Sequence, residues 1–425
     1  MKNLVASAAG CGSNGGVRIL LPTIAALLLS VAILVTGNGL QWTLIPVRAS
    51  LDGFAPLEIG LLGSAYYLGF ALGCLLGGRV IQRVGHIRAF TALTAIASTV
   101  VVTHALIANP AAWWVLRAIT GFCFAGLYLI IESWLNERAS NDNRGLVMAI
   151  YTMINLSVTI VGQMMLTLGD PADFPLFALA SILISLAAVP VALTAARPPA
   201  RLAQSRLRPA MLYTKSPVGV VGVLLAGVAT GAFWSLGPAY AIELGADSAQ
   251  VAIFMSITVL GGALVQWPLG RLSDRCDRRI VVVGLCVAGV VAALSLVLAG
   301  IGEQWVSRVL VAFFGASALP LYAICAAHAF DHIEAQDTVE TSSGLLLANG
   351  AGAIAGPVMA AFFMGKAGPG GLFLATAFAH LLLAGFVIWR VRTSAPIPPA
   401  ERSEFDLATT APTMVALTPE ETANE

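Results

Sequence analysis

Charged residues are scarce in this sequence. They make up 11% of its 425 residues, whereas about a quarter of the residues in a soluble domain are charged. Hydrophobic residues account for 58%, and the mean hydropathy is +0.86. This composition excludes an ordinary soluble domain and predicts an integral membrane protein. Because unpaired backbone groups are costly in hydrocarbon, apolar runs of about 20 residues predict spanning helices rather than a barrel.

The sequence also lacks the patterns that indicate catalysis, metal binding or disulfide bonding. No glycine-rich loop ends in Gly-Lys-Ser or Gly-Lys-Thr, so ATP-driven transport is not expected. The six cysteines, at positions 11, 74, 123, 276, 286 and 325, follow neither metal-ligand spacing nor a disulfide framework. Four histidines, His104, His328, His332 and His380, are too dispersed for a metal site. We therefore expect no enzyme, no cofactor, no metal and no nucleic-acid partner.

Long apolar runs divide the chain into two sets of six expected helices. The first set covers residues 18–47, 57–79, 88–108, 111–135, 145–168 and 174–195. The second covers 217–242, 248–271, 279–300, 304–329, 342–365 and 371–391. We expect an amino-terminal tail over 1–17, a bundle over 18–195, a basic linker over 196–216, a second bundle over 217–391 and a disordered tail over 392–425.

The basic residues lie mainly on one side of these expected helices. If the amino terminus is cytoplasmic, 19 of the 23 Lys and Arg residues fall on the cytoplasmic side. Arg48 and Lys366 fall outside, and Arg117 and Arg308 fall within helices. This positive-inside bias predicts that both termini are cytoplasmic.

Two short polar segments interrupt the apolar runs at equivalent places in the two halves. One begins at Gly78 and the other at Gly270, an offset of 270 − 78 = 192 residues. At that offset eight residues repeat without a gap, which indicates a duplicated chain. The first copy holds Trp42, Leu44, Pro46, Ser64, Gly69, Gly78, Arg79 and Arg83; the second holds Trp234, Leu236, Pro238, Ser256, Gly261, Gly270, Arg271 and Arg275.

The segment from Gly270 to Arg279 resembles the signature of the major facilitator superfamily. That signature is a glycine, three residues, Asp-Arg, one residue, a glycine and two basic residues, between helices two and three and again between eight and nine. The stretches 266–272 and 130–145 are similar to the uncharacterised YcaD-like branch of its bacterial members.

The resemblance implies an all-α integral membrane fold, with twelve transmembrane helices in two pseudo-symmetric six-helix bundles. It implies secondary transport of a small solute by alternating access, in which the bundles rock about a central site. It also implies a multi-pass protein of the bacterial inner membrane, surrounded by lipid bilayer, and we expect a monomer. Without a nucleotide site the driving force is the solute gradient or a coupled ion, for which we expect protons rather than sodium.

The first polar segment departs from the family signature. Gln82 occupies the aspartate position, and His86 and Ile87 replace the basic pair. A glutamine cannot form an ion pair, so we expect the ionic latch of the gate at Asp274, in the second half. The second polar segment, from Gly270 to Arg279, also departs from the signature, because Asp277 occupies its second glycine position. The expected gate and coupling residues are Gly78, Gln82, Arg83, Glu132, Arg144, Gly270, Asp274, Arg275 and Arg278.

Glu132 is the acidic residue expected to face the membrane interior, and two interpretations compete for it. A partly desolvated carboxylate near a gate could exchange a coupling proton during transport. Alternatively it pairs permanently with Arg83 or Arg144 as part of the inner gate, which is the interpretation that we favour.

Arg117 and Arg308 lie within expected helices at near-equivalent places. A guanidinium in a span normally faces a cavity or a partner, but each lies close to a tryptophan at the outer interface and could reach water there. By the family resemblance, helices one, four, seven and ten line the cavity. The expected substrate-binding residues are Asn38, Gln41, Trp42, Tyr66, Arg117, Tyr151, Asn155, Gln163, Trp234, Tyr240, Gln266, Arg308 and Asn349.

The two arginines and the few buried acids favour a neutral or anionic small solute over a cationic drug. The direction of transport stays open, with efflux slightly preferred. Gly352, Gly356 and Pro357 resemble the antiporter motif of drug exporters, but they lie in helix eleven rather than five, so close helix packing is the preferred interpretation. The alternatives are a non-transporting receptor or scaffold of the same fold, and a lipid or amphiphile translocase.

Overall fold

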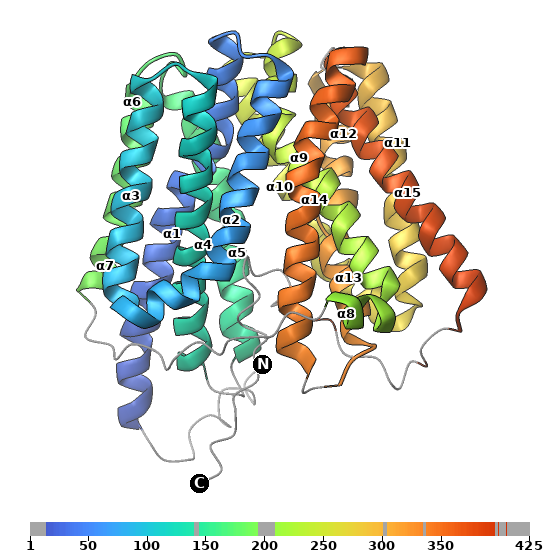
Figure 1. Cartoon of the computed structure of the whole chain (residues 1–425), viewed down its shortest axis with the longest axis horizontal. Helices are drawn as coiled ribbons and strands as arrows, with labels where there is room; N and C mark the ends of the chain where they lie inside the picture. Colours follow the sequence, from blue (N-terminus) through green and yellow to red (C-terminus); the bar gives the residue numbers. More distant parts are fainter. Residues whose placement is uncertain are drawn as a thin grey trace, which may run out of the picture.

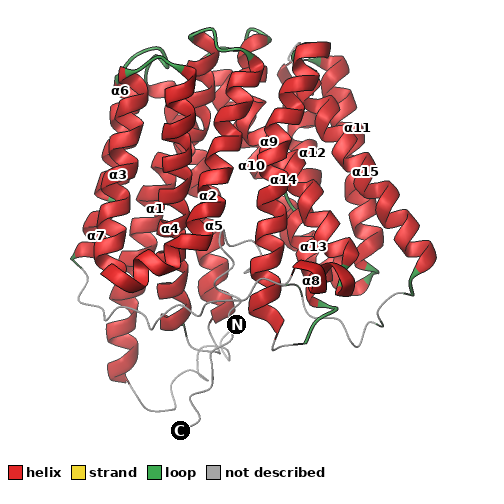
Figure 2. Ribbon diagram, in the orientation of Figure 1, coloured by secondary structure: helices red, strands yellow, loops and turns green. Residues whose placement is uncertain are grey.

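The computed structural model describes residues 14–139, 144–193, 209–300, 304–334, 337–395, 398 and 405. Within these ranges every regular element is a helix, as Figure 2 shows. The first half contains α1 (Asn14–Leu51), α2 (Pro56–Val84), α3 (His86–Leu106), α4 (Pro110–Arg138), α5 (Arg144–Met164), the 3₁₀ turn η1 (Met165–Leu168), α6 (Pro175–Leu186) and α7 (Ala188–Ala192). The second half contains α8 (Pro209–Lys215), α9 (Pro217–Glu243), α10 (Ser248–Arg275), α11 (Arg278–Ala299), α12 (Gln304–Ala318), α13 (Leu321–Phe330), α14 (Thr338–Ala367) and α15 (Gly371–Thr393).

The sequence marks the beginnings of several helices. Proline stands in the first turn of α2, α4, α6 and α9, where its missing N–H has no helical partner in any case. Asn109 caps α4 and Asp247 caps α10 through side-chain oxygens that accept backbone N–H groups. Gly85 joins α2 directly to α3 at φ 87°, a conformation that favours glycine.

Twelve helices in the described part of the chain are long and apolar enough to cross a membrane. They coincide with the twelve expected runs, although two of the spans are interrupted. The sixth is divided into α6 and α7, and the tenth into α12 and α13. The second interruption falls at Leu319 and Pro320, where the proline cannot continue the helical hydrogen-bond ladder. The apolar-run prediction missed both interruptions because each segment is hydrophobic on both sides of its break.

The helices form two groups that stand side by side (Figure 1). In the first group α2 packs on α4 and α1 packs on α5; in the second, α9 packs on α14 and α10 on α12. The groups meet where α2 contacts α14, α5 contacts α10 and α1 contacts α9. We call the side on which α1 begins and α15 ends the termini side, and the side of the α1–α2 and α9–α10 turns the far side.

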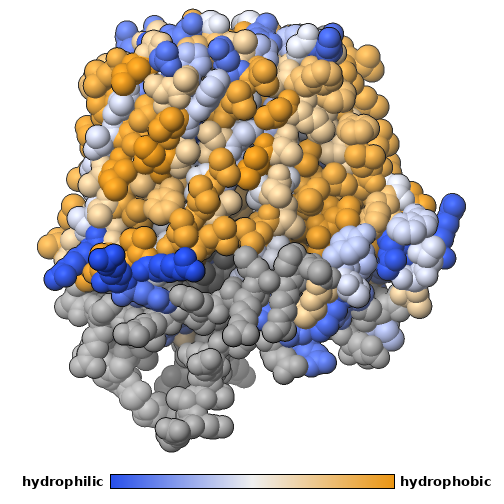
Figure 3. Space-filling view, in the orientation of Figure 1, coloured by the Kyte–Doolittle hydropathy of each residue, from blue (hydrophilic) through white to orange (hydrophobic). Residues whose placement is uncertain are grey.

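The outer surface of the two groups is apolar. Figure 3 shows hydrophobic side chains over the middle of the molecule and hydrophilic ones toward its upper and lower edges. Large side chains such as Leu298 (89% exposed) and Leu193 (80% exposed) face outward without protein cover. A surface of this kind is stable only where lipid covers it, and the chain is therefore a multi-pass membrane protein.

A short helix lies in the segment expected to be a linker. α8 begins at Pro209 and buries Leu212 against the second group. At its end, the Lys215 ammonium lies 2.7 Å from Asp337, at the start of α14. Hydrogen bonding to that carboxylate raises the pKa of Lys215 above its usual value. Residues 196–208, the rest of the expected linker, lie outside the described residues, as do 1–13 of the first tail and nearly all of the second.

Candidate functional site

A cavity of about 230 Å³ lies where the two groups of helices meet. Its walls come from α1, α2 and α4 of the first group and from α14 of the second. Four of the expected substrate-binding residues line it: Asn38, Trp42, Tyr66 and Asn349. The remaining walls are formed by Tyr67, Phe70, Ala71, Cys74, Tyr128, Leu346, Leu347 and Gly350.

Arg117 contacts two aromatic rings of the cavity wall but does not itself line the cavity. Its side chain is 2% exposed, and the guanidinium carbon stands 4.8 Å from the ring centre of Trp42 and 4.6 Å from that of Tyr66. Its Nη1 atom has no hydrogen-bond partner among the described residues. A guanidinium buried between two rings does not reach the membrane interface, so of the two interpretations only the inward-facing one fits this geometry.

Close contact between α2 and α4 places Tyr66 and Arg117 together. A Cβ atom at Gly69 would overlap the carbonyl oxygen of Ala118, and one at Gly121 would overlap that of Tyr66. Glycine at both positions allows the two backbones to touch, as small residues do at helix interfaces in membranes. The ring of Tyr66 therefore lies directly against α4, over the Arg117 side chain.

Toward the far side the two groups are in direct contact. The Ser64 hydroxyl of α2 donates a 2.7 Å hydrogen bond to the carbonyl oxygen of Ile354 in α14. A Cβ atom at Gly60 would lie only 2.7 Å from the carbonyl oxygen of Pro357. Across the interface, the ring centres of the repeat-related Trp42 and Trp234 lie 6.3 Å apart, with the two rings tilted by 55°. The structure therefore has the far-side end of the cavity closed.

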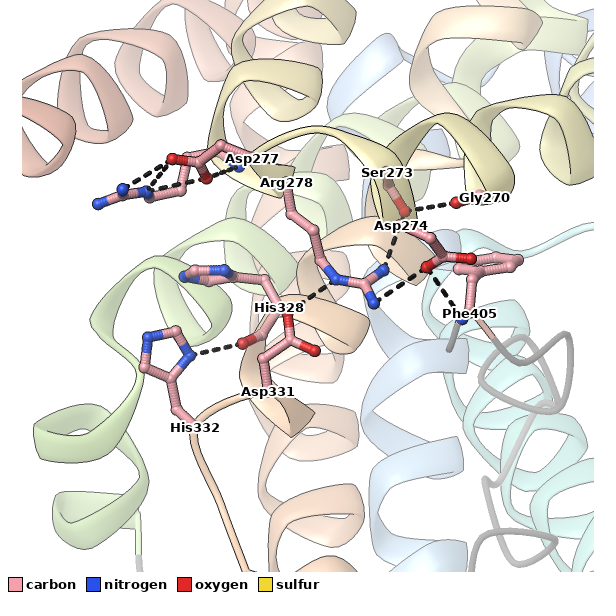
Figure 4. Close-up of polar contacts among 10 residues, drawn as sticks. Gly270, Ser273, Asp274, Asp277, Arg278, His328, Asp331, His332 and Phe405 are labelled. Carbon is pink, nitrogen blue, oxygen red and sulfur yellow. Dashed lines mark hydrogen bonds and ion pairs between the residues drawn. The ribbon is translucent and has the colours of Figure 1, made fainter. Parts of the chain in front are cut away.

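The polar segment of the second half forms a network around Arg278 on the termini side (Figure 4). The Arg278 side chain is 1% exposed; it lies 2.8 Å from Asp331 at the end of α13 and 3.1 Å from Asp274 in α10. It also donates a 2.9 Å hydrogen bond to the Ser273 hydroxyl. Asp274 is 30% exposed, whereas Asp331 is 2% exposed. The inner partner of Arg278 is thus Asp331, which the sequence did not single out.

Two further contacts flank this network. The backbone N–H of Phe405 donates a 3.0 Å hydrogen bond to Asp274, and its ring occupies the space that a Cβ atom at Gly270 would need (Figure 4). Asp277 caps α11 and lies 2.7 Å from Arg279. Burial raises the pKa of the Asp277 carboxyl, but its hydrogen bonds to Arg279 outweigh this and lower the pKa overall.

Glu132 is fully buried and faces α5. The hydroxyl of Tyr151 donates a 3.0 Å hydrogen bond to Glu132 Oε1. Arg83, one proposed partner of Glu132, is exposed on the surface at the end of α2. Arg144, the other, begins α5, but its side chain lies outside the described residues. Of the other expected gate residues, Gln82 and Arg275 are exposed and Gly78 is half-buried.

The remaining expected binding residues are dispersed. Gln41 and Gln163 are fully buried, and neither side-chain amide has a hydrogen-bond partner among the described residues. Tyr240 packs in the core of the second group, 4.9 Å from the Phe373 ring. Three others also lie away from the cavity wall. The Asn155 side chain donates a hydrogen bond to the backbone of its own helix, and Gln266 is half-buried in α10. The guanidinium carbon of Arg308 lies 5.2 Å from the ring centre of the exposed Trp305.

The sequence reasoning missed Tyr67, Phe70 and Tyr128 in the cavity wall. Tyr67 directly follows Tyr66, and Phe70 lies one helical turn after Tyr66, so the α2 residues occupy neighbouring faces. This local spacing was visible in the sequence. Tyr128 could not be found in this way, because only the packing of α4 on α2 brings it to 6.4 Å from Phe70.

Twelve spanning helices in two groups, with a cavity between them that is closed at one end, define a transporter of the alternating-access class. The model of the Major Facilitator Superfamily matches residues 27–220 and again 219–419, and the chain belongs to that family. It is 27% identical over 362 residues to an uncharacterised MFS-type transporter of Enterobacter sp. (strain 638), covering 84% of this chain and 92% of that one. It is also 27% identical over 365 residues to the uncharacterised MFS-type transporter YcaD of Escherichia coli O139:H28, with the same coverage.

Solved structures of other transporters share the fold. The crystal structure of the nucleoside transporter NupG aligns with a TM-score of 0.75 at 14% identity, covering 86% of this chain and 98% of that one. A bacterial homologue of the human lysosomal transporter Spinster, in an inward-facing and occupied conformation, aligns with a TM-score of 0.69 at 17% identity, covering 90% and 99%. These likenesses confirm the expected fold.

Proposed function

We propose that this chain is a proton-coupled secondary transporter of a small neutral or anionic solute, which binds in the cavity between the two groups of helices. In this proposal both termini are cytoplasmic and the protein lies in the bacterial inner membrane. The termini side is then the cytoplasmic side, and the closed far side faces outward. Support for this orientation comes from the excess of Lys and Arg at the termini-side ends of the helices.

The observation that carries the solute-binding part is the position of Arg117. An uncompensated cation within a membrane span is costly, and proteins retain one where it serves a site or a pathway. Here it borders a cavity whose wall includes Trp42 and Tyr66, with Asn38 and Asn349 supplying polar groups. Such an arrangement favours a solute with electron-rich or negative groups and disfavours a cation.

Support for proton coupling comes from Glu132. Its carboxylate is fully buried, and a neutral hydroxyl, that of Tyr151, donates to it. Burial favours the protonated form of a carboxylic acid, so a change in its surroundings during transport can load or release a proton. A permanent gate pair remains the competing role for this residue.

The test is transport by the purified full chain in liposomes, with an imposed pH gradient of either sense and a panel of metabolites. We expect accumulation that follows the pH gradient, together with exchange of solute at equal pH. If Glu132 is the proton site, Glu132→Gln abolishes gradient-driven accumulation and keeps equal-pH exchange. The matched control Asp173→Asn, at an exposed far-side acid, leaves both unchanged.

Two results would contradict parts of this proposal. Loss of both accumulation and exchange in Glu132→Gln, with the protein still folded, would assign Glu132 to the gate instead. Binding of a solute without any exchange would favour the receptor interpretation, and movement of labelled lipid between leaflets would favour a translocase.

A further inference from the structure

The cavity wall in the first group is an almost continuous surface of aromatic rings. Trp42 lies 4.5 Å from Tyr66 and 5.6 Å from Tyr67 between ring centres. Tyr66 stacks at 6.2 Å on Phe70, which in turn lies 6.4 Å from Tyr128. Rings at these separations offer faces and edges to a further ring, which gains contact area and favourable quadrupole geometry there. A flat aromatic group can lie against this wall and make such ring contacts.

One buried positive charge lies next to this wall. The Arg117 guanidinium contacts the rings of Trp42 and Tyr66 without itself lining the cavity, and its Nη1 atom has no hydrogen-bond partner among the described residues. A group touching the other face of Trp42, at a contact distance of about 3.5–4.0 Å, would lie about 8 Å from the guanidinium. At an effective dielectric constant near 20, a negative charge there gains affinity of about thirtyfold.

The polar atoms of the cavity also favour a substrate that can donate a hydrogen bond. Asn38 lines the cavity, but its Oδ1 is fully buried and presents no surface to a solute. Asn349 uses its Nδ2 to donate to the carbonyl oxygen of Val223, which leaves its Oδ1 as an acceptor. An amide oxygen that can accept favours a substrate carrying a hydroxyl or amino group.

The cavity is large enough for a small solute. Its volume of about 230 Å³ accommodates a single ring with short substituents.

We propose that the substrate is a single-ring aromatic anion with a hydroxyl or amino substituent, of the hydroxybenzoate type. The ring lies against Tyr66, Tyr67 and Phe70, the negative group lies next to Trp42 in the field of Arg117, and the substituent donates to Asn349. This inference rests on the proposed function, and it narrows the solute from neutral or anionic to one chemical class. Arg117 acts in it as a specificity-determining residue that does not touch the substrate.

The experiment compares probes that differ in one property each, by calorimetric titration of the purified full chain. The probes are 4-hydroxybenzoate, 4-hydroxybenzamide, which has the shape without the charge, and cyclohexanecarboxylate, which has the charge without the aromatic ring. We expect 4-hydroxybenzoate to bind at least tenfold more tightly than either of the others. Equal affinity for the amide and the acid would overturn the assignment of charge, and equal affinity for the cyclohexane acid would overturn that of the aromatic wall.

Variants then assign the preference to Arg117. Arg117→Met removes the charge and keeps an apolar side chain of similar length, so we expect the acid and the amide to bind within twofold of each other. Arg117→Lys keeps the charge and should restore the preference. The matched control Arg390→Met removes an arginine that also lies over a tryptophan ring, 5.7 Å from that of Trp389 in α15, and should leave the preference for the acid intact. An unchanged preference in a folded Arg117→Met variant would overturn the inference.

Equal-pH exchange in liposomes separates this inference from the proposed function. If sugars, amino acids or nucleosides exchange and no aromatic acid binds, the substrate class is wrong and the transporter stands. If no solute of any class exchanges, the proposed function itself fails.

Discussion

Loss of the Asp331 charge should destabilise the second group of helices more than loss of the Asp274 charge. Both carboxylates contact Arg278, but Asp331 is 2% exposed and Asp274 is 30% exposed. Removing one partner of a buried ion pair typically costs about 3–5 kcal/mol, because the other charge stays buried. Arg278 keeps Asp274 and Ser273 as partners, so we expect the lower end, about 3 kcal/mol, for Asp331→Asn. Water screens the outer pair, and Asp274→Asn should cost about 1 kcal/mol or less.

The assay is the midpoint of thermal unfolding in detergent, followed by the fraction of protein that remains monodisperse. We expect Asp331→Asn to lower the midpoint clearly more than Asp274→Asn does. A double variant, Arg278→Met with Asp331→Leu, supplies the control: replacing both buried charges by apolar groups of similar volume should recover most of the loss.

Two outcomes would refute this reasoning. If the two single variants lower the unfolding midpoint equally, burial does not determine which carboxylate contributes more to stability. A double variant no more stable than Asp331→Asn would mean that the cost does not come from an uncompensated charge on Arg278.

The glycines give further predictions. Gly270→Ala should displace the ring of Phe405, and we expect faster proteolysis of the carboxy-terminal tail as a result. The control is Gly78→Ala, whose Cβ would have nothing within 4 Å and which should leave the proteolysis rate unchanged. Equal rates in the two variants would contradict the contact between Gly270 and Phe405. Gly121→Ala should force α4 away from the backbone of Tyr66 and lower both the unfolding midpoint and solute affinity. Unaltered affinity in that variant would show that the spacing of the two helices does not position the cavity wall.

Composition predicted the fold because each spanning helix carries its own signal. An apolar run such as α11 must satisfy its backbone groups internally whatever its neighbours do, so length and hydropathy are enough to locate it. The division of a span is less visible: Pro320 interrupts a run that is hydrophobic on both sides, and the other helical prolines, such as Pro268, cause no break in the assigned helix.

The candidate site was predictable only where the chemistry was local. Arg117 could be recognised as a charge in a span, but its surroundings depend on the close contact of α4 with α2 at Gly69 and Gly121. Asp331 lies 331 − 278 = 53 residues from Arg278, in a segment with no signature of its own, and only the packing of α11 on α13 brings the two together. Tertiary packing determines long-range pairs of this kind, and the spacing of residues in the sequence does not predict them.

The far-side contacts between α2 and α14 have a thermodynamic consequence. They consist of a hydroxyl on a backbone carbonyl, at Ser64, and of small residues in van der Waals contact, at Gly60. Separating such surfaces changes hydration more than it changes charge, so the opening equilibrium should respond weakly to ionic strength and should carry a heat-capacity change. Its temperature dependence should therefore be curved, and the balance between the two accessible states should shift with the growth temperature of the cell.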